Sequence, residues 1–252
     1  MCTVVTLRRP DHRWPLLLAA NRDEMASRPW RRPGRHWPDR PNVVAGMDEL
    51  AGGTWLGVND EGVVAGILNR KNSLGPDPNL RSRGELVLEA LDHADAVEAA
   101  SALGALDGRS YRAFNMVIAD NRDAYWLKGL GPGGDGRVAV AELPEGVAML
   151  TSLELNDRAS GRIATYLPRF SAAPPPDPDA GNWQSWETLV ADRGSGAAGE
   201  DERGMVIVAD GGFGTLSSSL IALPSADRAG LRPAWRFCAG RPGEAPFDDV
   251  AL

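Results

Sequence analysis

The sequence predicts an α+β fold, a four-layer αββα sandwich of two largely antiparallel sheets. Short apolar segments punctuated by glycine occur in runs that alternate with helical segments, in the order strands, helices, strands, helix, strands. Several of these segments, such as VVAGIL and FNMVIA, are apolar throughout, so we expect them to be buried on both faces. With 252 residues, of which 43% are hydrophobic and 24% charged, we expect a single domain over residues 1–252.

The first half of the chain begins with a predicted β-hairpin. Residues 2–7 (CTVVTL) and 15–24 (PLLLAANRDE) are apolar strands, and the turn-forming residues between them connect the two. Further strands are expected at 43–47, 53–60 and 62–70. The alanines, leucines and i, i+3/i+4 apolar spacing of residues 82–103 then predict two helices, with a break near Asp92 and His93.

The second half resumes with strands. They are expected at 114–121, 123–130, 137–143 and 147–152. Residues 157–170 are predicted to be helical because their large apolar side chains share one face. A proline-rich loop, a short helix and a mobile glycine-rich loop are expected at 171–182, 183–192 and 194–204. Three strands, MVIVAD, SSLIAL and AWRFCAG, are expected to end the chain.

Composition and charge exclude several classes of protein. The formal net charge of −7 argues against general nucleic-acid binding. The basic stretch RPWRRPGRHWPDR (28–40) is expected to be a solvated loop, with an acidic ligand or a protein partner as the alternatives. No segment approaches the ~20 apolar residues of a membrane span, and LRRPDHR interrupts any signal-peptide core.

The cysteines and histidines point to a reducing compartment and to no cofactor. Cys2 and Cys238 are too few and too far apart for a disulfide framework, so we expect a cytoplasmic protein. Its three histidines stand in unrelated settings without a CxxC motif, which predicts no metal site. No glycine-rich phosphate-binding motif is present, and therefore no nucleotide or other cofactor is expected. Cys238 lies in an apolar strand and is expected to be buried and inert.

The position of Cys2 suggests nucleophilic chemistry. If Met1 is removed, Cys2 carries both a thiol and a free α-amine, and their pKa values of about 8.5 and about 7.7–8.0 make proton exchange nearly balanced. The predicted hairpin brings Asn21-Arg22-Asp23-Glu24, at the end of the second strand, beside the start of the first. The alternatives are that Cys2 is a small buried residue and that the charged strand end is a solvated turn.

Four sequence blocks carry a resemblance to a known family. In chain order they are LAANRDEMASRP, AGGTWLGVNDEGVVAGILNR, SRGELV and YRAFNMVIAD, and with the initial Met-Cys they cover most of the first 125 residues. They resemble the NRDE-domain family, also called the transport and Golgi organisation family. A more distant resemblance to penicillin V acylases and bile-salt hydrolases implies an N-terminal nucleophile (Ntn) hydrolase fold. The resemblance also implies links to haem trafficking and to lipid or acyl-coenzyme A metabolism.

The resemblance implies a catalytic set of Cys2, Arg22, Asp23 and Asn69. Cys2 would be the nucleophile and its amine the base, with Arg22 favouring the thiolate and Asp23 holding the ammonium form. Asn69 resembles a strand-end asparagine near the oxyanion, and its alternative is a turn-capping amide. The residues expected to bind or position a ligand are Asn21, Glu24, Trp55, Arg70 and Ser152. Asn21, Asp23 and Glu24 all remain candidates for the aspartate position of the hydrolases.

Some positions depart from the pattern or have a structural alternative. Thr151-Ser152 stands where the family typically has Ser-Asn, and Leu216 stands where it often has arginine. The Ser152 hydroxyl could still donate to an oxyanion. Gly52 and Gly53 are expected to meet a backbone need, with Trp55 covering the core or a pocket wall.

One function is expected first, with two alternatives. The first is a cysteine amidohydrolase or acyltransferase that acts through a thioester on carbon–nitrogen bonds other than peptide bonds, in a small amide or acyl substrate. The second is a non-catalytic carrier or chaperone of a hydrophobic ligand such as haem or an acyl-coenzyme A. The third is a protein-interaction module. The sequence determines neither the substrate nor the oligomeric state.

Overall fold

The computed structural model describes residues 2–194, 204–228 and 230–252. The predicted loop at 194–204 falls almost entirely outside these residues. Contacts between residues group the chain into two compact units, which are described in turn. The first unit comprises Met1–Arg28, Pro144–Pro224 and Pro233–Ala251, and the second comprises Pro29–Leu143, Ser225–Arg232 and Leu252.

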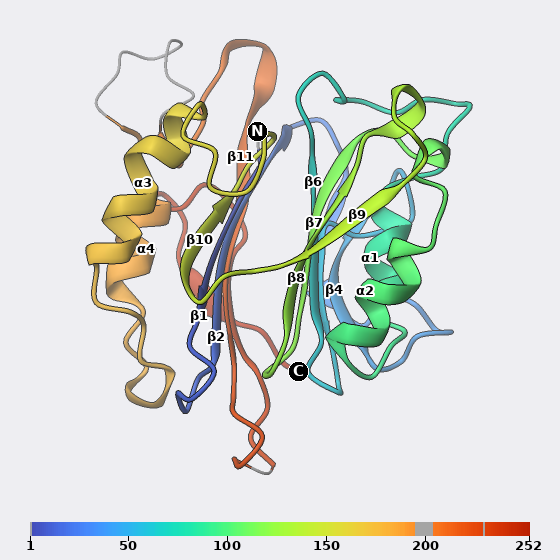
Figure 1. The fold of residues 1–252 in the computed structure, drawn as a ribbon. Coiled ribbons are helices and arrows are strands. Elements are labelled where there is room, and N and C mark those ends of the chain that lie inside the picture. The colour runs from blue at the N-terminus through green and yellow to red at the C-terminus, as the bar shows by residue number, and fades with distance from the viewer. Residues whose placement is uncertain (1, 195–203, 229) are drawn as a thin grey trace. The chain divides into compact units, whose positions relative to one another are not determined.

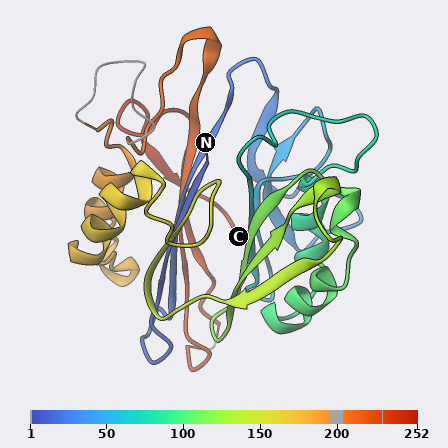
Figure 2. The same cartoon turned by 45° about the horizontal axis from the view of Figure 1, so that its top comes forward.

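The first unit is built on a six-stranded sheet in which all neighbouring strands are antiparallel. In sheet order the strands are β10 (Gly146–Leu150), β1 (Thr3–Arg8), β2 (Leu16–Met25), β11 (Phe213–Leu223), β12 (Ala234–Cys238) and β13 (Phe247–Asp249). The predicted hairpin is confirmed as β1 and β2, with Thr3 opposite Asn21. Helices α3 (Gly161–Ala172) and α4 (Gln184–Val190) pack on one face of this sheet (Figures 1 and 2).

The apolar periodicity of the sequence explains how α3 packs on the sheet. Ser160 caps the helix by accepting a hydrogen bond from the backbone N–H of Ile163, a common way to begin a helix. Ile163, Tyr166 and Phe170 then point to the sheet and are at most 1% exposed. Phe170 meets Trp186 of α4 edge to face, with ring centroids 5.3 Å apart. The two helices and the sheet face beneath them therefore share one apolar core.

The prediction of a strand at 205–210 (MVIVAD) is wrong. This segment forms only an isolated bridge, between Val208 and Gly214, beside the long strand β11. Gly211 and Gly212 both have positive φ and turn the chain sharply, so 205–209 return along β11 with irregular pairing. The backbone N–H of Ile207 bonds the Thr215 hydroxyl instead of a strand carbonyl. The apolar composition of this segment did not indicate that the Ile207 N–H would donate to a side chain.

The second unit is built on a seven-stranded antiparallel meander, whose strands follow chain order across the sheet. They are β3 (Trp30–Gly34), β4 (Val43–Asp48), β5 (Leu56–Asn59), β6 (Val64–Asn69), β7 (Phe114–Ala119), β8 (Ala124–Gly129) and β9 (Val138–Glu142). The two predicted helices are α1 (Gly84–Ala90) and α2 (Ala96–Gly104), and both pack on one face of this sheet (Figure 1). Two antiparallel sheets, each with its own pair of helices, confirm the predicted α+β class.

The basic segment at 28–40 is more ordered than expected. Residues 30–34 form the edge strand β3, and the pairing with β4 shifts register around Pro33, which an edge strand tolerates. Three arginines of the segment have acidic neighbours in the second unit. The pairs are Arg31–Glu49, Arg35–Asp60 and Arg40–Asp92, with nitrogen–oxygen distances of 2.6, 2.7 and 2.9 Å. Much of the local positive charge is thus matched within the second unit.

Short 3-10 turns lie at Gly108–Ser110, Gly131–Gly133, Pro178–Ala180 and Asp210–Gly212. Among residues 2–194, 204–228 and 230–252, no helix has the length and apolarity that crossing a bilayer requires.

Two of the sequence blocks meet through glycines. A Cβ atom on Gly53 would lie 2.6 Å from the carbonyl carbon of Gly84, and the N–H of Thr54 donates to the Gly84 carbonyl over 3.1 Å. Gly52, next to it, has φ +72°, so the expected backbone need is met at both positions. This contact explains why β5 begins only at Leu56 and not at 53.

We expect Gly53→Ala to destabilise the second unit by about 1–3 kcal/mol, because the added methyl group would push against backbone and not against a flexible side chain. Thermal and denaturant unfolding would measure this loss. Gly133→Ala is the matched control, since a Cβ atom there meets nothing within 4 Å. Equal stability of the two variants would contradict the close approach.

A cysteine site at the start of the first unit's sheet

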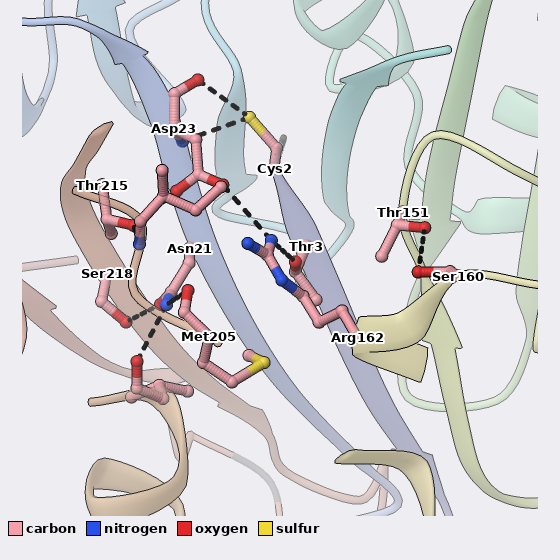
Figure 3. Close-up of polar contacts among 12 residues, drawn as sticks. Cys2, Thr3, Asn21, Asp23, Thr151, Ser160, Arg162, Met205, Thr215 and Ser218 are labelled. Atoms are coloured by element: carbon pink, nitrogen blue, oxygen red, sulfur yellow. Dashed lines mark hydrogen bonds and ion pairs between the residues drawn. The ribbon is translucent and has the colours of Figure 1, made fainter. Parts of the chain in front are cut away.

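Cys2 lies immediately before β1, beside the polar end of β2. Its side chain is partly exposed. The Sγ atom donates to the backbone carbonyl of Asp23 over 3.5 Å and accepts the backbone N–H of the same residue over 3.4 Å (Figure 3). The thiol is therefore held against the main chain of the NRDE tetrapeptide.

The pairing of β1 with β2 sorts the polar side chains between the two faces of the sheet. Thr3 and Asn21 are directly opposite each other, and successive residues of a strand alternate in direction. Thr3, Asn21 and Asp23 therefore lie on the face that α3 and α4 cover. Arg22 lies on the opposite face, where it is only 6% exposed, and the Cys2 sulfur lies at the main chain of Asp23. The hairpin thus gives the thiol a cationic neighbour and places the carboxylate behind it.

The Asp23 carboxylate is the centre of a buried polar network. Its side chain is fully buried, and Oδ1 accepts a hydrogen bond of 2.6 Å from the Thr215 hydroxyl of β11. Oδ2 lies 3.3 Å from Nη1 of Arg162, whose own side chain is 3% exposed. The same Nη1 donates to the hydroxyl of Thr3 (Figure 3). A buried carboxylate is costly unless it is paired and hydrogen-bonded, and Asp23 is both.

Asn21 makes a second set of buried contacts on this face. Its Nδ2 donates to the backbone carbonyls of Val190 and Met205, each over 2.9 Å, and its Oδ1 accepts from the Ser218 hydroxyl over 2.7 Å. Both amide hydrogens are used within the protein. This arrangement ties β2 to β11 and to the end of α4, which is a structural task.

Arg162, Thr215 and Thr3 were not among the residues singled out from the sequence. Arg162 lies four residues before Tyr166, on the same side of the predicted apolar face, and an arginine in that position is a signal of a buried partner. Nothing in the sequence identifies that partner, because Asp23 is 139 residues away. Thr215 gives no local signal either.

The remaining candidates in the first unit, Glu24 and Ser152, lie outside the hydrogen-bond network around Asp23 that is described above. Glu24 is half-buried; its Oε1 accepts the N–H of Met25 over 2.9 Å, and its Oε2 lies 3.9 Å from Nε of Arg28. Ser152 is buried just beyond β10, next to Thr151. Leu216 falls where the pairing of β11 with β2 shifts register, between Thr215 and Ser217.

Three candidates belong to the second unit. Asn69 is the last residue of β6 and is paired with Phe114 of β7. Arg70 donates through Nη1 to Oδ1 of Asn115 over 2.7 Å. Trp55 packs on Gly46, where an added Cβ atom would lie 2.4 Å from its ring, and the ring meets Trp30 edge to face. Trp55 thus covers the backbone at Gly46, and a place in a pocket wall stays a prediction.

The electrostatic surroundings of Cys2 raise the pKa of its thiol above the ordinary value. Burial has the largest effect, and the negative charge of Asp23 adds to it. The charge of the amino terminus, the hydrogen bond from the Asp23 backbone and the Arg22 guanidinium lower the pKa, in decreasing order. The thiol is therefore protonated at neutral pH, and any attack by its sulfur requires a base.

No metal site is evident in the described part of the chain. Among residues 2–194, 204–228 and 230–252, no group of three or more histidine, cysteine, aspartate or glutamate side chains is placed to hold an ion.

The fold is similar to that of Ntn-hydrolase-like acylases. An N-acylethanolamine-hydrolysing acid amidase orthologue from Caenorhabditis elegans is 12% identical, with a TM-score of 0.54 over 92% of this chain and 98% of its own. Penicillin V acylase from Agrobacterium tumefaciens is 14% identical, with a TM-score of 0.53 over 100% and 98%. A variant of conjugated bile acid hydrolase from Clostridium perfringens is 12% identical, with a TM-score of 0.57 over 99% and 92%. The protein therefore has an Ntn-hydrolase-like fold.

Within that class the chain belongs to the Transport and Golgi organisation 2 family, whose model matches residues 1–158. The Transport and Golgi organization protein 2 homologue of Bos taurus is 38% identical over 111 residues, 42% of this chain and 38% of that protein. The human homologue is 38% identical over 112 residues, again 42% and 38% of the two chains. The matched stretch thus spans well under half the length of these relatives.

We expect Asn21→Ala to lower the free energy of unfolding by about 2 kcal/mol or more, since it leaves two buried carbonyls and a hydroxyl without the amide. Denaturant unfolding measures the change. Asn42→Ala removes an exposed amide that contacts Glu61 and should change stability by less than about 0.5 kcal/mol. Two variants of equal stability would show that the Asn21 contacts contribute little.

We expect Arg22→Gln to raise the pKa of the Cys2 thiol further, because it removes a charge that lowers that pKa. The thiolate fraction at a given pH then falls, and the pH profile of alkylation by iodoacetamide moves to higher pH. Rates are read by intact mass in a Cys238→Ala background, in which Cys2 is the one remaining thiol. Arg13→Gln, an exposed arginine paired with Asp179, is the control. A profile that moves to lower pH would contradict the assignment.

Proposed function

We propose that the protein is an N-terminal-cysteine amidohydrolase or acyltransferase that acts on a small amide or acyl substrate through a thioester. The observation that carries the proposal is the position of the Cys2 sulfur, which contacts both the N–H and the C=O of Asp23. The Asp23 carboxylate is buried and paired with Arg162. The likeness of the fold to solved acylases supports the same chemistry.

The proposed reaction begins with removal of Met1, which frees the α-amine of Cys2. The amine takes the thiol proton, and the sulfur attacks the substrate carbonyl to form a carbon–sulfur bond. The ammonium then returns the proton to the leaving amine as the carbon–nitrogen bond breaks, and a thioester remains. Water or a second acyl acceptor attacks the thioester with the amine as base, and the carbon–sulfur bond breaks to restore the thiol.

Residues around Cys2 have distinct roles in this proposal. Arg22 favours the thiolate, and Asp23 holds the ammonium form of the amine in place. The buried Ser152 hydroxyl is an expected donor to the oxyanion, and the oxyanion role of Asn69 stays a prediction.

The alternative function is a carrier of a hydrophobic ligand such as haem or an acyl-coenzyme A. The raised pKa of the Cys2 thiol favours it, because a protonated thiol is a poor nucleophile and a tolerable neighbour for an apolar ligand. Saturable ligand binding that Cys2→Ala leaves unchanged, without any acylation of the protein, would support the carrier.

We expect the purified protein to lack the mass of Met1 and to form a covalent adduct with a p-nitrophenyl acyl ester at Cys2. Cys2→Ala should abolish the adduct, because it removes the nucleophile. Cys238→Ala is the matched control, since Cys238 is fully buried and its sulfur donates to the Gly240 and Ala245 carbonyls. Intact mass spectrometry measures both results.

Two outcomes would reject the proposed function. Retention of Met1 would leave the mechanism without its base. Persistent labelling of Cys2→Ala, with loss of labelling in Cys238→Ala, would place the reactive thiol in β12.

A further inference from the structure

Arg162 contacts both strands of the hairpin that forms the cysteine site, β1 through Thr3 and β2 through Asp23. It lies in the first turn of α3, and its guanidinium reaches the sheet of the first unit (Figure 3). One nitrogen, Nη1, contacts both the Thr3 hydroxyl and Oδ2 of Asp23. Thr3 follows Cys2 in the chain, and Asp23 supplies the backbone groups that flank the Cys2 sulfur. One buried cation thus connects the strand that carries the thiol with the strand that cradles it.

Arg162 contacts the Asp23 carboxylate, and the backbone of Asp23 contacts the Cys2 sulfur. Arg162 and the Asp23 carboxylate lie on the helix-covered face of the sheet, whereas the Cys2 sulfur lies at the main chain of Asp23. The charged groups that act directly on the thiol are Asp23 and Arg22 of β2 and the amino terminus. Asp23 in turn faces Arg162 of α3 and the uncharged Thr215 of β11.

We propose that Arg162 is a positioning residue for Cys2, which balances the charge of Asp23 and holds it in place so that the thiol keeps its seat and its reactivity. The proposal rests on the assignment of Cys2 as the reactive thiol in the proposed function. It adds a residue from α3, far from the NRDE tetrapeptide in sequence, to the determinants of that reactivity.

The test measures alkylation of Cys2 by iodoacetamide between pH 6 and pH 10, in the Cys238→Ala background. Arg162→Met leaves the Asp23 charge unbalanced, and an unbalanced negative charge beside a thiol raises its pKa. We expect the profile to move up by about one pH unit and alkylation near neutral pH to slow about tenfold. Arg162→Lys keeps the cation and should fall between this variant and the parent.

Ile163→Ala is the matched structural control. Ile163 is the next residue of α3, is fully buried in the apolar core and has no contact with Asp23 among those of the network. It should lose stability while its alkylation rate stays within about twofold of the parent. An Arg162→Met rate within about twofold of the parent, or an Ile163→Ala rate as low as that of Arg162→Met, would overturn the proposal.

A second comparison repeats Arg162→Met in an Asp23→Asn background. Since this background has no carboxylate at position 23, the loss of Arg162 leaves no unpaired buried charge there, and the double variant is expected to fold more readily. If Arg162 acts through Asp23, the substitution Arg162→Met should change the alkylation rate by less than about twofold when Asp23 is already Asn. A tenfold slowing in the Asp23→Asn background would show that Arg162 acts by another route, and would overturn the proposal even if Arg162→Met alone did not fold.

Alkylation requires no turnover, so the test separates the two proposals. An Arg162 effect on alkylation together with no acylation by the p-nitrophenyl ester would retain the positioning role and reject the hydrolase. Acylation of the parent that is equally fast in Arg162→Met, with an unchanged alkylation profile, would retain the hydrolase and reject the positioning role.

Discussion

The register between β1 and β2 is the constraint on which the cysteine site depends. Because side chains alternate along a strand, the pairing of Thr3 with Asn21 decides which groups face the helices and which face away. A slip of one residue would exchange the positions of Cys2 and Thr3. The register is secured on the other side of β2 by its ten-residue partnership with β11, and by the Asn21 amide, which reaches past the sheet to the end of α4.

The polar face that results is unusual for a sheet covered by helices. Further along the same strands the covered positions are apolar, such as Val5, Leu17 and Ala19. At the end next to Cys2 they become Thr3, Asn21 and Asp23, and Arg162 supplies the balancing cation. Burying such groups does not stabilise a fold unless each is paired, and replacement by apolar residues could be more stable. The presence of Asp23 and Arg162 therefore points to a requirement of the site and not of the core, whereas Asn21 ties β2 to β11 and α4.

Local sequence patterns were sufficient for most of the fold but not for the site network. Periodicity and turn residues predicted the β1–β2 hairpin, the helix pair within 82–103 and the apolar face of α3, because each depends on neighbours in sequence. The edge strand β3 was missed since its arginines read as a solvated loop, and 205–210 was wrongly predicted as a strand since its bonding depends on the Thr215 side chain. The pairing of Asp23 with Arg162 spans 139 residues, and no local pattern encodes it.

The raised pKa of the Cys2 thiol and the proposed role of Asp23 are compatible when the whole proton transfer is considered. Moving the proton from sulfur to the amine creates one negative and one positive charge. A carboxylate near both opposes the thiolate and favours the ammonium, so its two effects on the transfer largely cancel. In the proposed mechanism the thiol ionises as its own amine accepts the proton. Asp23 can fill this part only while its carboxylate is held in place, and the contacts with Arg162 and Thr215 hold it there.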